Sequence, residues 1–366
     1  MLAPGRQSLV TASQIKEWQS SDYPYPTGED ERDDREASLL NRGICLLGEL
    51  GEFEPYLDRI ATEPFIQILR DNFTDIAALE VAQCAMNALV YLHPNSISRY
   101  FHPIAMEVNK ANKVMIAPNA VFKASKDQLY HEAFVGLYGT NQIRKTIPHF
   151  AFVFAAFRCG KPIGTAPCKG KKEYEYVVYE NVHNSVPLAK YVQSCTSKEF
   201  IQIYLQVLYA LWFAHQTLDF THYDLHSGNV LVRYLPEVRN ITMPSKQGPV
   251  FFNTNTIPTI IDYGFSHILY QGRHYGAYRL LEFGVMPDAS FPLSDAFKLL
   301  ASCAKDATKN QSVYSVIEDI FHFFSDESPS YILYTTEYIF LPPPLRLTAP
   351  SLDDFIQYIY QRFPDI

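Results

Sequence analysis

The feature that most constrains the fold is one long amphipathic helix that is followed by a loop of polar residues. Residues 196–199 read Thr-Ser-Lys-Glu, a capping box in which the Thr and Glu side chains satisfy free N–H groups at a helix start. Apolar residues then recur at i, i+3, i+4 and i+7 from Phe200 to Trp212. This pattern predicts a core helix, and the polar sequence THYDLHSGN comes next along the chain.

Two short apolar runs after this loop are predicted to be strands, Val230–Tyr234 and Ile257–Ile261. The insertion 235–258 between them is expected to form a surface hairpin. The second run leads into an Asp-Tyr-Gly sequence. There, Gly264 is expected to allow a sharp backbone turn that directs the side chain of Asp262 into the cleft.

The polar residues around these strands have the spacing that phosphoryl transfer needs. His222, Asp224 and Asn229 form the pattern H-x-D-x-x-x-x-N. Transfer requires a carboxylate near the attacking hydroxyl and oxygen ligands for Mg²⁺. Asp224 is the candidate base, and Asn229 and Asp262 are the candidate metal ligands. The alternative, that these are ordinary turn residues, requires the spacing, the capped helix and the flanking strands to coincide.

The preceding part of the chain reads as a small antiparallel sheet with one helix against it. The helix is expected at about Lys126–Tyr138. The predicted strands are short β-prone runs separated by turn signals: Lys113–Ile116, Ala120–Lys123, Ala151–Cys159 and Tyr174–Glu180.

The two ends of the chain differ in character. Residues 1–36 are polar and end in an acidic run, which is typical of a solvated arm. Residues 37–97 read as a helical subdomain, and part of it resembles an armadillo or HEAT helix pair. From about Ser294 to the end the chain is predicted to be mainly helical.

Residues 196–264 resemble the catalytic core of the eukaryotic-type protein kinase family, whose motifs are H-R-D-L-x-x-x-N and D-F-G. The forms HYDLHSGN and IIDYG are most similar to serine/threonine kinases of large DNA viruses. The resemblance covers roughly residues 110–300. It implies an α+β, bilobal protein-kinase-like fold with a small lobe at 98–185, a large lobe at 186–366 and the added N-terminal helical subdomain.

The resemblance also implies how ATP would be held. Lys123, which ends the run VFK, would bind the phosphates and pair with Glu132. Lys126 is a nearby competitor for the first role, and Glu132 has the alternative of a solvated helix residue. The backbone of Glu180 and Val182 would offer groups to adenine.

Two further residues are given supporting roles by the resemblance. Tyr179 would guard the back of the nucleotide pocket, with a plain strand aromatic as the alternative. Asp295 would brace the catalytic loop, to which His222 also belongs, through backbone hydrogen bonds. A helix N-cap is the other explanation for Asp295.

The sequence departs from the family pattern in four places. No G-x-G-x-x-G precedes Lys123, so the phosphates would be covered differently. Tyr223 replaces the Arg that often links the loop to a phosphorylated segment, which favours constitutive competence. His226 stands where a Lys is usual, and either contacts the γ-phosphate or has a structural role. No A-P-E follows Gly264.

The leading hypothesis is a serine/threonine protein kinase that uses ATP and Mg²⁺ and acts on a protein substrate. The second is a small-molecule kinase of the aminoglycoside/choline type, whose D-x-H-x-x-N pattern fits Asp224, His226 and Asn229. The third is a pseudokinase or scaffold that binds a partner protein through the N-terminal helices.

Composition and charge limit the binding partners and the cellular compartment that we expect for the chain. The net charge is −8 with no basic stretch, which argues against binding to nucleic acid or to an anionic membrane. The most apolar helical run, 201–214, is shorter than the about 20 residues of a membrane span. Six scattered cysteines without a C-x-x-C pattern are predicted to be unpaired. We therefore expect a cytoplasmic protein, in the host cytoplasm if its origin is viral, with packaging in a virion left open.

Overall fold

The described chain is a mixed α+β fold in two compact units. The computed structural model describes residues 107–109, 114–116, 120–125, 129–144, 146–159, 174–180, 182, 184–270, 272–276, 289–325 and 351–364. Unit 1 holds the described residues up to 146 and from 152 to 180, and unit 2 holds 147–151 and those from 182 onward. The predicted arm at 1–36 and helical subdomain at 37–97 lie outside the described residues.

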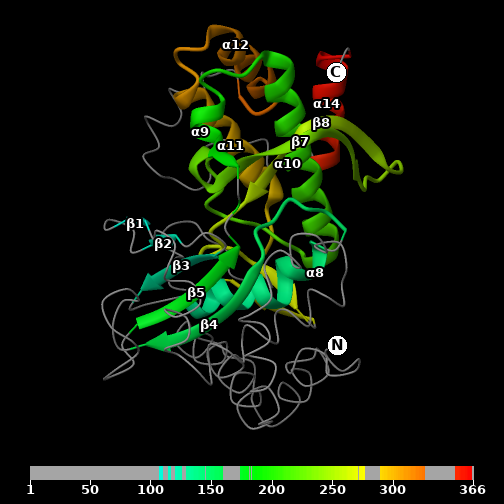
Figure 1. Cartoon of the computed structure of the whole chain (residues 1–366). Coiled ribbons are helices and arrows are strands. Elements are labelled where there is room, and N and C mark those ends of the chain that lie inside the picture. Colours follow the sequence, from blue (N-terminus) through cyan, green and yellow to red (C-terminus); the bar gives the residue numbers. More distant parts are fainter. Residues whose placement is uncertain are drawn as a thin grey trace. The chain divides into compact units, whose positions relative to one another are not determined.

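Unit 1 is built on an antiparallel sheet with the strand order β1-β2-β3-β5-β4 (Figure 1). The predicted strands are confirmed with small changes of boundary. The observed strands are β1 (Glu107–Asn109), β2 (Val114–Ile116), β3 (Ala120–Ser125), β4 (Val153–Cys159) and β5 (Tyr174–Glu180).

Strand β4 begins two residues later than the sequence predicts. The cause is that the residues before it belong to unit 2. There Phe150 forms a parallel bridge with Ile260, and the Ala151 N–H donates to the Ile260 carbonyl at 2.9 Å. A β-prone run can thus be divided between two units, which the local pattern does not reveal.

The helix that the structure describes in unit 1 is longer and less regular than predicted. It starts as α7 (Leu129–Phe134), continues as a π-helix (Val135–Thr140) and ends as α8 (Asn141–Ile143). It therefore passes the predicted end at Tyr138. The helix packs against β4 and β5. A Cβ on Gly136 would lie 2.2 Å from Cγ2 of Val153, so only glycine permits this close approach to β4.

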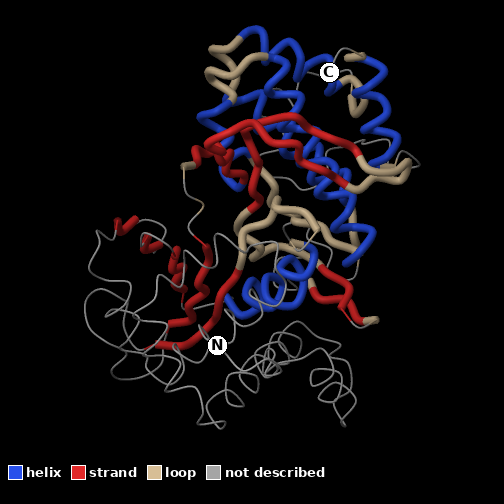
Figure 2. The backbone as a smooth tube through the Cα atoms, turned by 45° about the vertical axis from the view of Figure 1, so that its right-hand side comes forward, coloured by secondary structure: helices blue, strands red, loops and turns tan. Residues whose placement is uncertain are grey.

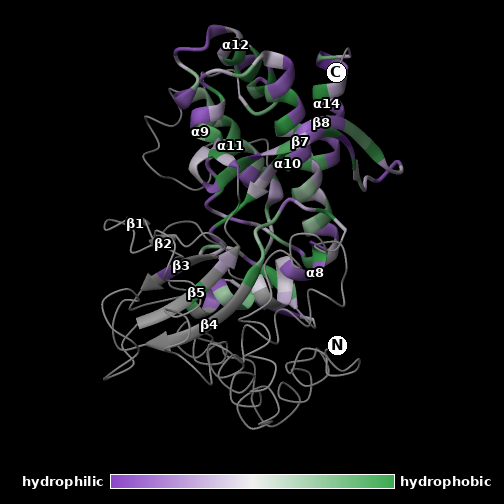
Figure 3. Ribbon diagram, in the orientation of Figure 1, coloured by the Kyte–Doolittle hydropathy of each residue, from purple (hydrophilic) through white to green (hydrophobic). Residues whose placement is uncertain are grey.

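Unit 2 is organised around the predicted core helix, α10 (Ser197–Leu218). Both hydrogen bonds of the Thr196–Glu199 capping box are present. The residues that the 3.6-residue period marks as apolar are buried, among them Phe200, Ile203 and Leu211. In Figure 3, green stretches of hydrophobic residues alternate along this helix with white and purple ones. Among the described helices, none is long and apolar enough to cross a membrane.

The predicted surface hairpin is present, and it is continuous with the two predicted strands. β7 (Val230–Met243) and β8 (Val250–Ile260) form a long antiparallel pair of strands (Figure 2). Their register shifts between Tyr234 and Arg239. β6 (Ser185–Pro187) adds a third strand to this sheet.

The remaining elements of unit 2 support the loop regions. α9 (Leu188–Tyr191) precedes α10, and a 3-10 turn, η2 (Ser227–Asn229), follows the polar loop. β9 (Ile268–Tyr270) and β10 (Arg273–Tyr275) form a short hairpin. The predicted C-terminal helices are α11 (Pro292–Asp306), α12 (Gln311–Phe321) and α14 (Leu352–Arg362). The rings of Phe297 in α11 and Phe321 in α12 are 5.3 Å apart, and the ring of Phe355 in α14 lies 4.7 Å from that of Phe324, just after α12.

Two of the cysteines that are predicted to be unpaired have described side chains. Cys195 and Cys303 are buried and carry free thiols. The side chains of the other four cysteines are outside those described.

Candidate active site

In unit 1 the structure brings Lys123 and Glu132 together. Lys123 lies on β3 opposite Val177 of β5, and Glu132 lies on α7. The Lys123 ammonium is 3.0 Å from Oε1 and 2.8 Å from Oε2 of Glu132. Glu132 is only 1% exposed, so the interpretation as a solvated helix residue is wrong. Lys126, the competing lysine, is outside the described residues.

Tyr179 differs from an ordinary aromatic residue of a strand, because its hydroxyl makes a buried hydrogen bond. Its hydroxyl donates to Oε1 of Glu132, so the carboxylate is held by both a lysine and a tyrosine. Tyr179 is buried on β5, one residue before the end of the strand. The sequence named Tyr179 as a pocket residue but gave no indication of this hydrogen bond.

The two residues proposed to contact adenine fall at the division between the units. Glu180 ends β5 in unit 1, with its backbone paired to Ala120. Val182 belongs to unit 2, where its carbonyl accepts a hydrogen bond from Ser185 Oγ at 2.5 Å. Their role in adenine binding stays a prediction.

In unit 2 the carboxylate of Asp295 accepts two backbone hydrogen bonds from the polar loop. The N–H of His222 donates to Oδ2 at 2.6 Å, and the N–H of Tyr223 donates to Oδ1 at 2.8 Å. The N-cap of α11 is Phe291, so the alternative interpretation of Asp295 as an N-cap is wrong. Burial raises the pKa of Asp295 to about 7, while the two N–H donors and Lys298 act in the opposite direction.

Lys298 completes this bracing, and sequence reasoning missed it. Its ammonium donates to the carbonyl of Tyr223, one helical turn from Asp295 on α11. Burial lowers the pKa of Lys298, and the nearby Asp295 opposes that shift. The i, i+3 spacing of Asp295 and Lys298 was a usable signal, because such residues share one face of a helix.

Tyr223, which stands in place of the family Arg, is turned into the fold. Its backbone is left-handed with φ of 61°, which is uncommon for a bulky residue. Its side chain is 3% exposed, and its hydroxyl donates to the Ala289 carbonyl at 2.6 Å. These contacts fix the peptide that precedes Asp224.

His222 is fully buried and both of its ring nitrogens are engaged. Nε2 lies 2.9 Å from the Ile261 carbonyl, and because a carbonyl only accepts, Nε2 carries the proton. Nδ1 then accepts from the Asp224 N–H at 3.3 Å. Burial lowers the pKa of His222, which favours this neutral form. The ring therefore joins the polar loop to the strand end just before Asp262.

Asn229 makes a second tie between the same two segments. Its side-chain Nδ2 donates to the Asp224 carbonyl at 3.0 Å, and its backbone carbonyl accepts from the Ile261 N–H at 3.0 Å. Because Nδ2 is the donor, the amide oxygen is the group left to meet a cation. The Asp224 side chain is 42% exposed, which gives a solvent-borne hydroxyl access to its carboxylate.

The sharp bend after β8 does not fall where the sequence predicts. The residue with a left-handed backbone is Asp262 itself, with φ of 68°, whereas the prediction assigned the bend to Gly264. The neighbouring Tyr263 is buried, and its hydroxyl donates to the carbonyls of Ala151 at 2.8 Å and Ile260 at 3.1 Å. Anchoring of Tyr263 thus holds the backbone that orients Asp262.

His226 is a local capping residue. Its Nδ1 accepts from the Gly228 N–H at 3.0 Å, which caps the 3-10 turn η2. Its Nε2 lies 4.0 Å from Oδ2 of Asp224, and the side chain is 48% exposed. The structural role is therefore present, and a contact with phosphate stays a prediction.

The donor set of unit 2 is compatible with Mg²⁺. Asn229 offers an amide oxygen and Asp262 a carboxylate, and hard oxygen ligands of this kind are those that Mg²⁺ prefers. Both side chains stand at the ends of segments that hydrogen bonds through Ile261 tie together.

The comparisons with known proteins find distant relatives among iridescent viruses. Protein 035R of Invertebrate iridescent virus 3, described as uncharacterized, is 28% identical over 181 residues, which are 44% of this chain and 16% of the relative. Protein 179R of Invertebrate iridescent virus 6, also described as uncharacterized, is 25% identical over 257 residues, 66% of this chain and 21% of the relative. The probable kinase 098L of Invertebrate iridescent virus 3 is 29% identical over 144 residues, 38% of this chain and 27% of the relative.

The chain thus spans less than a third of the length of each of these relatives. No protein-family model matches it. Among solved structures, WaaP in complex with acyl carrier protein aligns with 62% of this chain and 89% of that chain at 12% identity, and the TM-score of 0.30 is too low to support an inference. The chain is therefore a distant relative of iridovirus proteins, one of which is named a probable kinase.

Proposed function

We propose that this chain is a phosphotransferase that moves the γ-phosphate of ATP to a serine or threonine hydroxyl of a protein. The distant relationship to a viral protein named a probable kinase supports the reaction class. The choice of a protein acceptor rests on the resemblance of HYDLHSGN and IIDYG to viral serine/threonine kinases.

One observation carries the proposal: two hydrogen-bonded ties join the loop that bears Asp224 and Asn229 to the strand end that bears Asp262. His222 Nε2 donates to the Ile261 carbonyl at 2.9 Å, and the Ile261 N–H donates to the Asn229 carbonyl at 3.0 Å. A chain that needed only a turn here would not require a buried histidine and a strained aspartate beside each other. Phosphoryl transfer does require such fixed oxygen groups.

Each residue then has a defined task. Asp224 accepts the proton of the attacking hydroxyl, and its exposed carboxylate suits that contact. Asn229 and Asp262 would hold Mg²⁺, which neutralises charge on the phosphates when bound. Lys123, oriented by Glu132, would bind phosphate oxygens. His222, Asp295 and Lys298 act as positioning residues.

The test is Mg²⁺-dependent transfer from ATP by the purified full chain to a generic protein acceptor. Asp224→Asn and Asp262→Asn are expected to lower kcat by about 100-fold or more, since each removes a carboxylate at the reacting groups. Asp319→Asn is the matched control, because Asp319 pairs with Arg362 at 2.9 Å on the surface of the same unit. Equal activity in all four proteins would contradict the proposal.

A second acceptor class has an observation in its favour. Asp224, His226 and Asn229 also fit the pattern of small-molecule kinases, and His226 Nε2 lies 4.0 Å from Asp224 Oδ2. A panel of serine and threonine peptides beside aminoglycosides and choline discriminates the two. Transfer only to the small molecules would replace the protein acceptor, and absence of both nucleotide binding and transfer would favour the scaffold hypothesis.

A further inference from the structure

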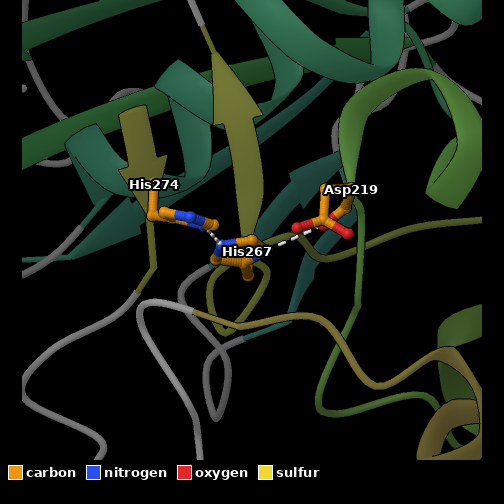
Figure 4. A group of neighbouring side chains, drawn as sticks. All are labelled: Asp219, His267 and His274. Carbon is orange, nitrogen blue, oxygen red and sulfur yellow. Dashed lines mark hydrogen bonds between the residues drawn. The ribbon is translucent and has the colours of Figure 1, made fainter. Parts of the chain in front are cut away.

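Unit 2 contains a second cluster of ligand-bearing side chains, formed by Asp219, His267 and His274 (Figure 4). Asp219 caps the C-terminus of α10. His267 directly precedes β9, and His274 is the central residue of β10. One ligand atom from each residue lies within 4.8 Å of the other two. None of the three belongs to the proposed transfer site.

The protonation of His267 is set by its hydrogen bonds. Nδ1 lies 2.8 Å from the backbone carbonyl of Asp219, and since a carbonyl only accepts, Nδ1 carries the proton. Nε2 therefore presents a lone pair, and it lies 2.9 Å from Nδ1 of His274. An imidazole whose other nitrogen donates to a backbone carbonyl has the tautomer and orientation typical of metal-binding histidines.

Backbone pairing and ring stacking hold the two histidines in place. His267 and Thr221 exchange backbone hydrogen bonds at 2.8 and 3.2 Å, which fixes His267 next to the end of α10. His274 pairs with Leu269 in the β9–β10 hairpin. The two imidazole rings stack, with centroids 5.1 Å apart and planes 29° from parallel. His267 is fully buried, so its ring has little freedom to leave this arrangement.

We propose that His267 Nε2, His274 Nδ1 and the Asp219 carboxylate bind a divalent transition metal ion, and that zinc is the ion they fit. Two imidazoles and one carboxylate are an established ligand set for zinc with a further position open to water. Nitrogens bound to one tetrahedral zinc lie about 3.3 Å apart, given Zn–N bonds of about 2.0–2.1 Å. The two imidazole nitrogens need to separate by only a few tenths of an ångström.

The carboxylate needs the larger adjustment, and its surroundings allow it. The Asp219 side chain is 30% exposed. Its Oδ1 lies 3.2 Å from His215 Nδ1, so Oδ2 can turn to the metal while His215 orients the carboxylate from outside. His274 would take up its ring proton on Nε2, which frees Nδ1 for the metal without any net change in protons.

A metal at this place would join the end of α10 to the β9–β10 hairpin. His267 lies in the segment that follows Asp262, and its backbone bonds to Thr221, the residue before His222. The ion would therefore stabilise the segment that follows Asp262 where it pairs with the polar loop. Metal binding itself does not depend on the proposed function. Only an effect of the metal on phosphate transfer would rest on the proposed function.

The experiment is a zinc titration of the metal-stripped full chain by calorimetry, without nucleotide. We expect one zinc per chain. His274→Gln and Asp219→Asn should each weaken binding by about tenfold or more. Asn tolerates the left-handed backbone of Asp219, whose φ is 50°, so the cap is retained. His322→Gln, at an exposed histidine after α12, is the matched control and should bind like wild type.

Cobalt substitution and hydrogen exchange give independent readouts. Cobalt should show the strong visible absorption of a four-coordinate site, and zinc should slow exchange of the amides in β9 and β10. Absence of binding by wild type would overturn the proposal. Binding that both His274→Gln and Asp219→Asn retain unchanged would also overturn it, since the ion would then lie elsewhere.

Discussion

At the scale of single residues, the proposed transfer site concentrates backbone strain. Tyr223 and Asp262 both have left-handed backbones, with φ of 61° and 68°. Such conformations persist only where surrounding contacts enforce them, and here the anchors are buried tyrosine hydroxyls and the Asp295 carboxylate. The strain is consistent with a site in which geometry matters more than stability.

Two substitutions at Asp262 separate the effect of backbone strain on stability from the effect of losing the carboxylate. Asp262→Ala and Asp262→Gly both remove the carboxylate, but only alanine has a Cβ that opposes a positive φ. We expect the alanine variant to have a free energy of unfolding about 1 kcal/mol lower than the glycine variant. Urea denaturation of both proteins measures the difference. Higher stability of the alanine variant would mean that the backbone at 262 is not left-handed in solution.

Lys298 should matter for catalysis although it lies outside the predicted site. Lys298→Met keeps the apolar stem but removes the donor to the Tyr223 carbonyl. We expect kcat of the proposed transfer to fall by about tenfold while KM for ATP changes little, since Asp224 loses its fixed position. Steady-state kinetics beside Lys298→Arg measure this. Rescue by arginine is expected, and a KM change without a kcat change would contradict a positioning role.

At the scale of elements, the helix of unit 1 is shaped by one close approach. The π-helical segment Val135–Thr140 brings Gly136 against Val153 of β4. Asn141 also reaches β4, where its Nδ2 donates to the Val153 carbonyl at 2.8 Å and its Oδ1 accepts from the Val153 N–H at 3.0 Å. A widened turn therefore serves to fit the helix to the sheet.

Gly136→Ala tests this fit. The new Cβ would lie 2.2 Å from Cγ2 of Val153, and we expect a loss of about 1–3 kcal/mol in the free energy of unfolding. Val153→Ala removes the opposing methyl groups, so the double variant should be more stable than the sum of the two single effects predicts. Thermal unfolding of the four proteins gives the coupling. Strict additivity would show that residues 136 and 153 do not touch.

At the scale of the whole molecule, the described chain is two compact units, and residues with a role in the proposed function occur in both. Unit 1 holds Lys123, Glu132 and Tyr179, and unit 2 holds the polar loop and Asp262. The core of unit 2 includes two thiols, Cys195 and Cys303. Burial raises the pKa of Cys195 to about 12 and raises that of Cys303 well above its usual value.

These thiols should report on the integrity of unit 2. In the folded protein at pH 8 neither cysteine should react with iodoacetamide, because the thiolate is the reactive form and both groups are protonated and buried. Both should be modified in urea. Peptide mapping by mass spectrometry distinguishes them from the other four cysteines. Rapid modification of Cys303 in the native protein would indicate that α11 opens readily.

The sequence by itself determined the local features of this protein. The capping box at Thr196, the burial period of α10 and the strands on either side of the polar loop follow from residues close together in the chain. These features depend on backbone hydrogen bonding and side-chain direction within a few residues, which a sequence pattern records directly. The candidate site residues were found for the same reason, since His222, Asp224 and Asn229 lie within eight positions.

Only the tertiary structure decided which distant residues meet. The bond from Tyr179 to Glu132 spans 47 positions, and the bond from Tyr223 to Asp295 spans 72. The contact between His267 and Asp219 spans 48 and left no motif in the sequence. Such pairs form because the packing of helices and strands brings their segments together, and that packing depends on the whole core rather than on any local spacing.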